Sequence, residues 1–185
     1  MKKGSKTTKR FSSCREERNQ KPQEGGNVML FSESEQKAIE EKLEQLRKVR
    51  DGTLTPQELA NLITQRRVFW FEENENAVLS KYHGLPDQEK AYRIIFFDHM
   101  RINPERSKMI KISKGKIRIE SYNFCPYLEA CRRLGLDTIF VCKEIGEPSI
   151  REVCKLINPD LKFSRNYQNI RPYNNFCEEY FELSK

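Results

Sequence analysis

Residues 107–121, SKMIKISKGKIRIES, decide the fold class of this chain. On both sides of Ser113-Lys114-Gly115-Lys116, isoleucines alternate with lysine, serine or arginine. A period of two is typical of a β-strand with one buried face, and glycine at the centre permits a tight turn. The stretch therefore predicts a β-hairpin whose strands span 107–113 and 116–121.

A second pair of strands is expected near the end of the chain. Residues 160–166 and 176–183 have strand character, and a loop rich in Tyr, Asn and Pro, 167–175, joins them. Between the two pairs, prolines at starts and glycines at ends predict short helices. These helices are expected over 126–134, 138–145 and 148–157. The C-terminal part, 107–183, is thus predicted as a four-stranded antiparallel sheet covered by helices.

Residues 32–102 have helical periodicity instead. Ser32 with Glu35 forms a capping-box pattern, and Thr55-Pro56-Gln57-Glu58 starts a second helix. We expect that helix to break or kink near Glu72–Asn76, and a third helix to run from Pro86 to Asn103-Pro104. The chain is therefore predicted as a single α+β domain, 28–185, with a helical N-terminal part.

Composition excludes several classes of protein. The chain has 185 residues, of which 37% are hydrophobic and 33% charged, with a net charge of +7. No apolar run approaches the roughly 20 residues that a membrane-spanning helix needs, and the basic start lacks the apolar segment of a secretory signal. We expect a cytoplasmic protein without membrane contact, whose six cysteines are thiols.

The first residues differ from the rest in charge. Residues 1–30 hold eight Lys or Arg against three Glu and few large apolar side chains. Such a segment cannot bury enough apolar surface to fold. Residues 1–27 are therefore predicted to be a disordered basic tail that is dispensable for folding. A nucleic acid bound through this tail is the least favoured of the partners considered.

Cys125 differs from the other cysteines because it lies directly before Pro126, the expected first residue of a helix. A thiol at a helix N-terminus gains from the free backbone N–H groups and from the helix dipole, which lower its pKa. We therefore predict that Cys125 is the most reactive of the five cysteines in the C-terminal part. In this role it would be a catalytic nucleophile.

The other catalytic candidates are proton-transfer groups. Glu129 lies one turn after Cys125, and His99 lies on the apolar face of the third predicted helix. Either could move protons for a Cys125 thiol. Tyr122 and Asn123 precede Cys125 and are expected to contact a substrate.

The C-terminal part also carries the run Phe124-Cys125-Pro126-Tyr127-Leu128-Glu129-Ala130-Cys131, followed by Leu134-Gly135, Cys142, Asn158-Pro159, Leu161-Lys162-Phe163-Ser164-Arg165 and Cys177. These motifs resemble the L-2-amino-thiazoline-4-carboxylic acid hydrolase-like family and, more distantly, vinyl-4-reductase-like ligand-binding domains. The resemblance covers about residues 107–183. It implies an α+β ligand-binding fold and a site formed by Cys125, Cys142 and Cys177, with Arg165 holding a substrate carboxylate.

Several functions are compatible with this pattern. The first is a small-molecule-binding domain that acts as a cysteine-dependent hydrolase of a small nitrogen or sulfur compound. The second is a ligand-binding or sensor domain without enzymatic activity. The third is a metal protein using Cys125, Cys142 and Cys177, with Cys154 or His99 as fourth ligand, although no C-x-x-C pair announces a zinc site. The sequence assigns no cofactor, and it leaves a homo-oligomer open.

Overall fold

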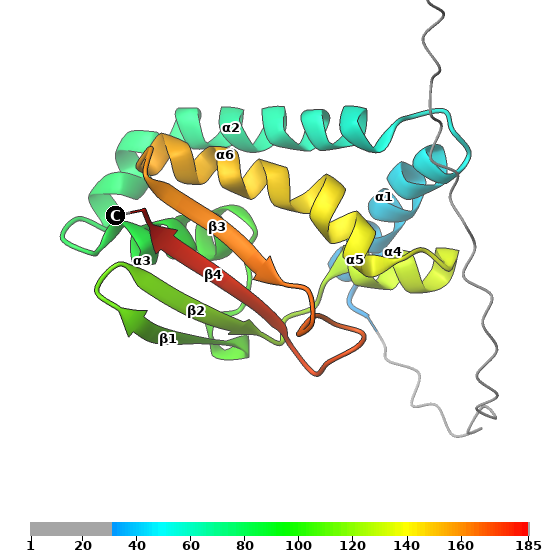
Figure 1. Cartoon of the computed structure of the whole chain (residues 1–185). Helices are drawn as coiled ribbons and strands as arrows, with labels where there is room; N and C mark the ends of the chain where they lie inside the picture. Colours follow the sequence, from blue (N-terminus) through cyan, green and yellow to red (C-terminus); the bar gives the residue numbers. More distant parts are fainter. Residues whose placement is uncertain (1–30, 185) are drawn as a thin grey trace, which may run out of the picture.

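The protein is described by a computed structural model that places residues 31–184. It has the predicted α+β fold, in which helices precede and cover a four-stranded antiparallel sheet (Figure 1). The prediction of a disordered tail over residues 1–27 lies outside the described residues. The elements are α1 (Glu33–Arg50), α2 (Pro56–Lys81), α3 (Asp87–Tyr92), η1 (Arg93–His99), η2 (Pro104–Arg106), β1 (Ser107–Ser113), β2 (Lys116–Ser121), α4 (Pro126–Leu134), α5 (Thr138–Phe140), η3 (Val141–Gly146), α6 (Glu147–Ile157), β3 (Leu161–Asn166) and β4 (Cys177–Leu183).

The sheet has the strand order β1-β2-β4-β3, and each neighbouring pair is antiparallel. The register pairs Phe181 with both Ile117 and Phe163, and these three side chains are buried on one face. The predicted hairpin therefore forms with the expected bounds. The second pair begins one residue later on each strand than predicted.

Helix α2 runs without interruption through Glu72–Asn76, where a break was predicted. Phe71 and Val78 are buried on either side of this polar stretch and hold the helix against the core. The Asn74 side-chain amide donates to the Trp70 carbonyl at 2.8 Å, one turn back. The polar stretch is solvent-exposed surface of a continuous helix, and the prediction of a break was wrong.

Two helical segments contain π-helix, which the sequence pattern does not predict. The third predicted helix is α3 continued as η1, and the predicted helix 138–145 is α5 continued as η3. A π-helix shifts the hydrogen bonds by one residue, and such segments are frequent at functional sites. Both segments pack against α2.

The interior is divided into two hydrophobic clusters. The first cluster lies between the inner face of the sheet and the helices α2, α3, η1 and α6, with Phe71, Phe96 and Phe181 at its centre. The second lies between α1, α4, η3 and the beginning of α2, and it includes Leu43 and Leu59. Figure 1 shows α6 between α2 and the sheet, while α1 and α4 pack together at one end.

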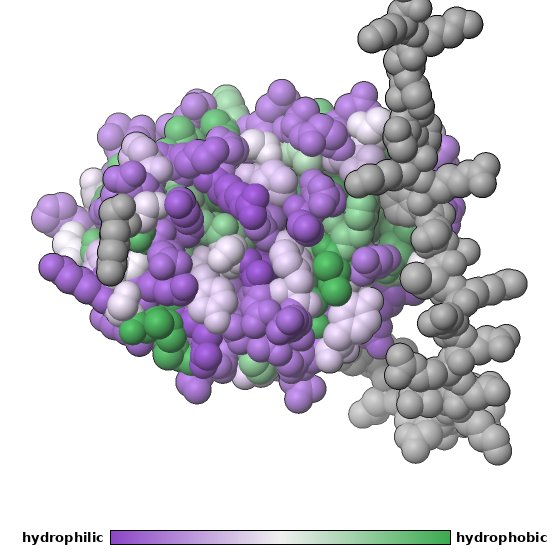
Figure 2. All heavy atoms as spheres, viewed as in Figure 1, coloured by the Kyte–Doolittle hydropathy of each residue, from purple (hydrophilic) through white to green (hydrophobic). Residues whose placement is uncertain are grey.

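The surface is mostly polar. Figure 2 shows a predominantly hydrophilic face over the sheet and α6, with hydrophobic side chains in small separate patches. Within residues 31–184, no helix combines the length and the apolar character needed to cross a membrane.

Candidate functional site

Arg67 is a charged residue in an otherwise apolar stripe of α2. Leu59, Ile63, Arg67 and Phe71 follow one another at a spacing of four, which places them on one face of the helix. Leu59 and Ile63 belong to the second cluster and Phe71 to the first, so Arg67 lies at the junction of the two. Its Nε and Nη1 atoms are buried and have no hydrogen-bond partner among the described residues.

Burial also changes the ionisation of Arg67. Its pKa falls to about 10, because the guanidinium is desolvated and the positive charge of Arg165 lies nearby. Tyr127, Cys154 and Glu179 are close enough to oppose this shift. Arg67 nevertheless remains protonated at neutral pH, as a buried cation with no ion pair to any residue of 31–184.

Arg165 is buried too, but its charge is paired. Its Nε donates to Glu179 Oε1 at 2.7 Å, and its Nη1 donates to the Cys142 carbonyl at 3.4 Å. The two ionic side chains are only 11% and 6% exposed. Strand β3 supplies the arginine and β4 the glutamate, at opposed positions in the register. The carboxylate that pairs with Arg165 therefore belongs to the protein itself, so fewer N–H groups of Arg165 are free to bind the carboxylate of a ligand.

The structure brings together the three cysteines that the resemblance implied. Cys125 precedes α4, Cys142 lies in η3, and Cys177 begins β4. Cys177 and Arg165 influence the pKa of both Cys125 and Cys142, and Cys125 also influences the pKa of Cys142. The three thiols and this arginine therefore share one region. Each of the three cysteines is partly buried. The cysteines therefore converge, although they come from distant parts of the chain.

Cys125 is the N-cap residue of α4, as predicted, but its pKa moves in the direction opposite to the prediction. Burial raises the pKa of the Cys125 thiol, and the nearby N–H of Leu128 and the charge of Arg171 only oppose that rise. The thiol makes no capping hydrogen bond. Desolvation of the thiolate therefore outweighs the helix N-terminus here, and the expected lowering of the pKa was wrong.

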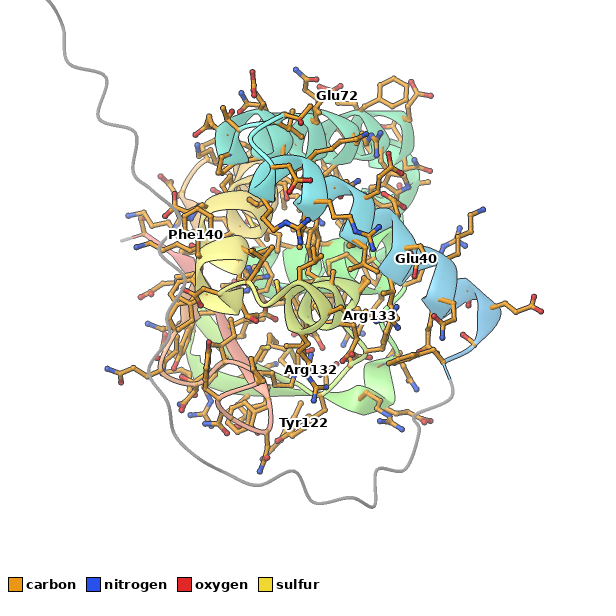
Figure 3. All side chains as sticks on the ribbon, turned by 90° about the vertical axis from the view of Figure 1, so that its right-hand side faces the viewer. Glu40, Glu72, Tyr122, Arg132, Arg133 and Phe140 are labelled. Carbon is orange, nitrogen blue, oxygen red and sulfur yellow. The ribbon has the colours of Figure 1, made fainter. Side chains whose placement is uncertain are left out.

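The remaining predicted site residues have structural partners. Glu129 pairs with Arg132 at 3.3 Å on α4. The exposed Tyr122 donates to Glu120 at 3.3 Å, and the buried Asn123 donates to the Arg106 carbonyl at 2.9 Å. Tyr122 lies at the outer edge of the molecule in Figure 3. Their roles in contacting a substrate stay predictions.

His99 ends η1, and its ring meets the Trp70 ring edge to face with centroids 4.7 Å apart. Its Nδ1 is buried without a partner among the described residues. The pKa of His99 is lowered to about 4 by burial and by the charge of Arg67. The structure thus associates His99 with Arg67, and no hydrogen bond among the described residues joins it to Cys125.

A metal site finds no support in the geometry. Among residues 31–184, no group of three or more His, Cys, Asp or Glu side chains is placed to hold a metal ion. The converging cysteines are therefore not arranged as metal ligands.

Two surface cavities lie elsewhere. The larger, of about 890 Å³, is at the end of the sheet where the β1–β2 turn meets the start of α3, and its lining includes Gln88, Lys114 and Lys162. The smaller, of about 310 Å³, lies between α1 and α2. Neither is lined by a cysteine, Arg67 or Arg165.

The sequence-based reasoning missed Arg67. The available signal was an arginine four residues after Ile63 and four before Phe71, where the helical period requires an apolar residue. Arg165 was identified, but its pairing with Glu179 needs the register of β3 on β4. We name Arg67, Arg165, Cys125, Cys142 and Cys177 the arginine–thiol site.

No family model matches the chain, and no curated protein matches it. A solved structure that is similar is trafficking protein particle complex subunit 3 from Naegleria fowleri, described as covalently bound to palmitic acid. The two chains are 15% identical with a TM-score of 0.47, over 82% of this chain and 95% of that chain. A likeness this remote carries no argument about ligand or partner.

Proposed function

We propose that this protein is a small-molecule-binding domain whose ligand presents an anionic group to the arginine–thiol site. The observation that carries the proposal is the pair of buried Arg67 N–H groups without a partner among the described residues. A buried cation without a counter-ion is costly, since it has lost its hydration and gained no hydrogen bonds in return. A bound anion would supply a counter-charge and would accept hydrogen bonds from these N–H groups.

The local charge balance points the same way. Arg67 and Arg165 contribute two positive charges, and among residues 31–184 the only ion pair that involves either of them joins Arg165 to Glu179. Arg171 adds a third guanidinium close enough to influence Cys125, and its Nε is also buried without a partner among residues 31–184. The surplus of positive charge favours a ligand with at least one negative charge.

Binding is favoured over cysteine-dependent hydrolysis. Hydrolysis needs a thiolate, and burial raises the pKa of Cys125, Cys131, Cys142 and Cys154. These thiols are therefore protonated at neutral pH. In the binding role, Cys125 and Cys142 form a weakly polar wall beside Arg165.

The test compares two neighbouring arginines. Arg67→Met removes the buried guanidinium and keeps the length of the side chain, while Arg66→Met is the matched control, because the Arg66 side chain is 75% exposed. The probes are acetate, benzoate and L-2-amino-thiazoline-4-carboxylate, the last chosen from the family resemblance and paired with its uncharged carboxamide. Calorimetric titration measures binding to the full chain.

We expect at least one carboxylate to bind, and Arg67→Met to weaken it about tenfold or more, in line with a lost charge-assisted hydrogen bond. Arg66→Met is expected to bind the carboxylate as the unchanged chain does. The carboxamide measures the binding that does not depend on the negative charge of the probe. Equal binding by the two variants, or no binding of any carboxylate, contradicts the proposal. Mass spectrometry of the same mixtures detects ring opening of the thiazoline; ring opening that stops in Cys125→Ser would establish the hydrolase instead.

A further inference from the structure

Arg67 and His99 both carry buried polar atoms that have no hydrogen-bond partner in the described part of the chain, and the charge of Arg67 reaches His99. Among residues 31–184 there are seven such side-chain atoms, and three of them are Arg67 Nε, Arg67 Nη1 and His99 Nδ1. Trp70 follows Arg67 by three residues and is therefore its neighbour on the helix surface. His99 packs on the Trp70 ring at 4.7 Å. The imidazole is therefore close enough to Arg67 for the positive charge of the guanidinium to lower its pKa.

Building on the proposed anion site, we infer that His99 shares the bound anion with Arg67 and takes up a proton when the anion binds. The ligand group is a carboxylate. Arg67 donates N–H groups to it, and the imidazole, once protonated, donates from Nδ1. The proton comes from solvent and stays on His99 while the anion is bound, so that no covalent bond of the ligand changes.

The charge relations explain why the proton arrives with the anion. In the free protein, the positive charge of Arg67 and the burial of the ring hold the pKa of His99 at about 4. A carboxylate between the two groups neutralises the effect of Arg67 and gives the imidazolium a partner, and both changes favour the protonated form. The charged neighbour on η1 itself, Asp98, is paired through Oδ1 with Lys81 of α2 at 2.5 Å, and its Oδ2 is buried without a hydrogen-bond partner among residues 31–184.

Linkage gives the size of the effect. If the bound state restores His99 from a pKa of about 4 to an ordinary value of about 6.5, the affinity for the carboxylate rises about 20-fold between pH 7 and pH 5. The same change requires uptake of about one proton per anion near pH 5. A site that used arginine alone would show neither.

The experiment uses the full chain and L-2-amino-thiazoline-4-carboxylate, benzoate or acetate, whichever binds. Titration calorimetry at pH 5 and pH 7, in two buffers of different ionisation enthalpy, measures affinity and proton uptake. His99→Gln is expected to bind with little pH dependence and little proton uptake. The chain has two histidines, and His83→Gln is the matched control because His83 is exposed. Subtracting His99→Gln from the unchanged chain removes titration of the probe itself.

A ligand-free measurement completes the test. NMR titration follows the two imidazoles, with His83→Gln identifying the signal of His99. Arg67→Met is expected to raise the pKa of His99, and Arg66→Met to leave it unchanged. If carboxylate binding needs Arg67 but is equally pH-dependent in His99→Gln, the inference is overturned and the proposed function stands. If binding does not need Arg67, or no carboxylate binds, both are overturned.

Discussion

At the scale of single residues, His99 makes stability depend on pH even without a ligand. Its pKa is 6.5 in the ordinary state and about 4 in the fold, so the unfolded chain binds more protons between these values. Its contribution to stability is therefore complete above pH 6.5 and is lost as the pH falls towards 4. We expect the midpoint of thermal unfolding to fall over this range, and to fall less in His99→Gln.

The control for this experiment is again His83→Gln, which should follow the unchanged chain. Carboxylates that lose their charge in acid contribute to all three proteins equally, and the difference between variants isolates His99. Parallel curves for His99→Gln and the unchanged chain would show that His99 is protonated equally in both states.

The thiols give a second prediction at this scale. Burial raises the pKa of Cys131 and of Cys154 to about 12, and it also raises that of Cys125. We expect iodoacetamide at pH 8 to leave Cys131 and Cys154 unlabelled over a time in which the denatured chain is fully alkylated. Site-resolved mass spectrometry measures the labelling. Rapid modification of Cys125 at neutral pH would instead support the sequence-based prediction of a reactive nucleophile.

The case of Cys125 shows where sequence reasoning about a site reaches its limit. The proline after Cys125 correctly indicated an N-cap position, because proline suits the first turn of a helix. The sign of the pKa shift depends on how deeply the thiol is buried in the assembled fold, where Cys142 of η3 and Cys177 of β4, both distant in the sequence, lie near it. Local pattern predicts position along an element, whereas desolvation is a property of the assembled core.

At the scale of elements, the caps and the hairpin were predictable from short stretches. The capping box of Ser32 with Glu35 forms as the sequence predicts, and Thr55 caps α2 as expected, with Glu58 completing a second capping box. Their signals are local, because each involves residues three positions apart. The continuity of α2 was not predictable in this way, since it depends on Phe71 and Val78 packing against other elements.

An ion pair also joins helices α1 and α4. Arg133 of α4 lies near Glu40 of α1 at 3.3 Å, and both are labelled in Figure 3. This pair is partly exposed and contributes little, as surface ion pairs usually do. The association of α1 with α4 rests on the apolar residues of the second cluster, such as Leu43 and Ala130.

Replacing each of two phenylalanines of α2 tests which face of this helix packs against the core. Phe71 is 1% exposed and Phe69 is 63% exposed, although they are two residues apart. Phe71→Ala is expected to lower the free energy of unfolding by about 3–5 kcal/mol, because it removes a buried ring and leaves a cavity. Phe69→Ala should change it by about 0.5 kcal/mol or less. Urea unfolding followed by circular dichroism measures both, and similar losses would contradict the placement of α2.

At the scale of the whole molecule, the arginine–thiol site lies where two hydrophobic clusters meet. Each cluster is assembled from segments far apart in the chain: α2, α6 and the sheet in the first, α1, α4 and η3 in the second. A polar group at such a junction interrupts apolar packing from both sides. Arg67 is half-buried as a residue, while its Nε and Nη1 atoms are buried at this junction.

The last prediction follows from that position. If Arg67 is kept for a ligand, the free protein carries an uncompensated buried charge, and replacing it with an apolar side chain of similar length should stabilise the fold. Arg67→Met is expected to raise the free energy of unfolding by about 1–3 kcal/mol, while Arg66→Met should leave it nearly unchanged. Chemical denaturation at pH 7 without added anions measures the difference, and a saturating carboxylate should reduce it by stabilising only the chain that binds. A loss of stability in Arg67→Met would show that the guanidinium supports the core, and the anion-binding role would lose its physical basis.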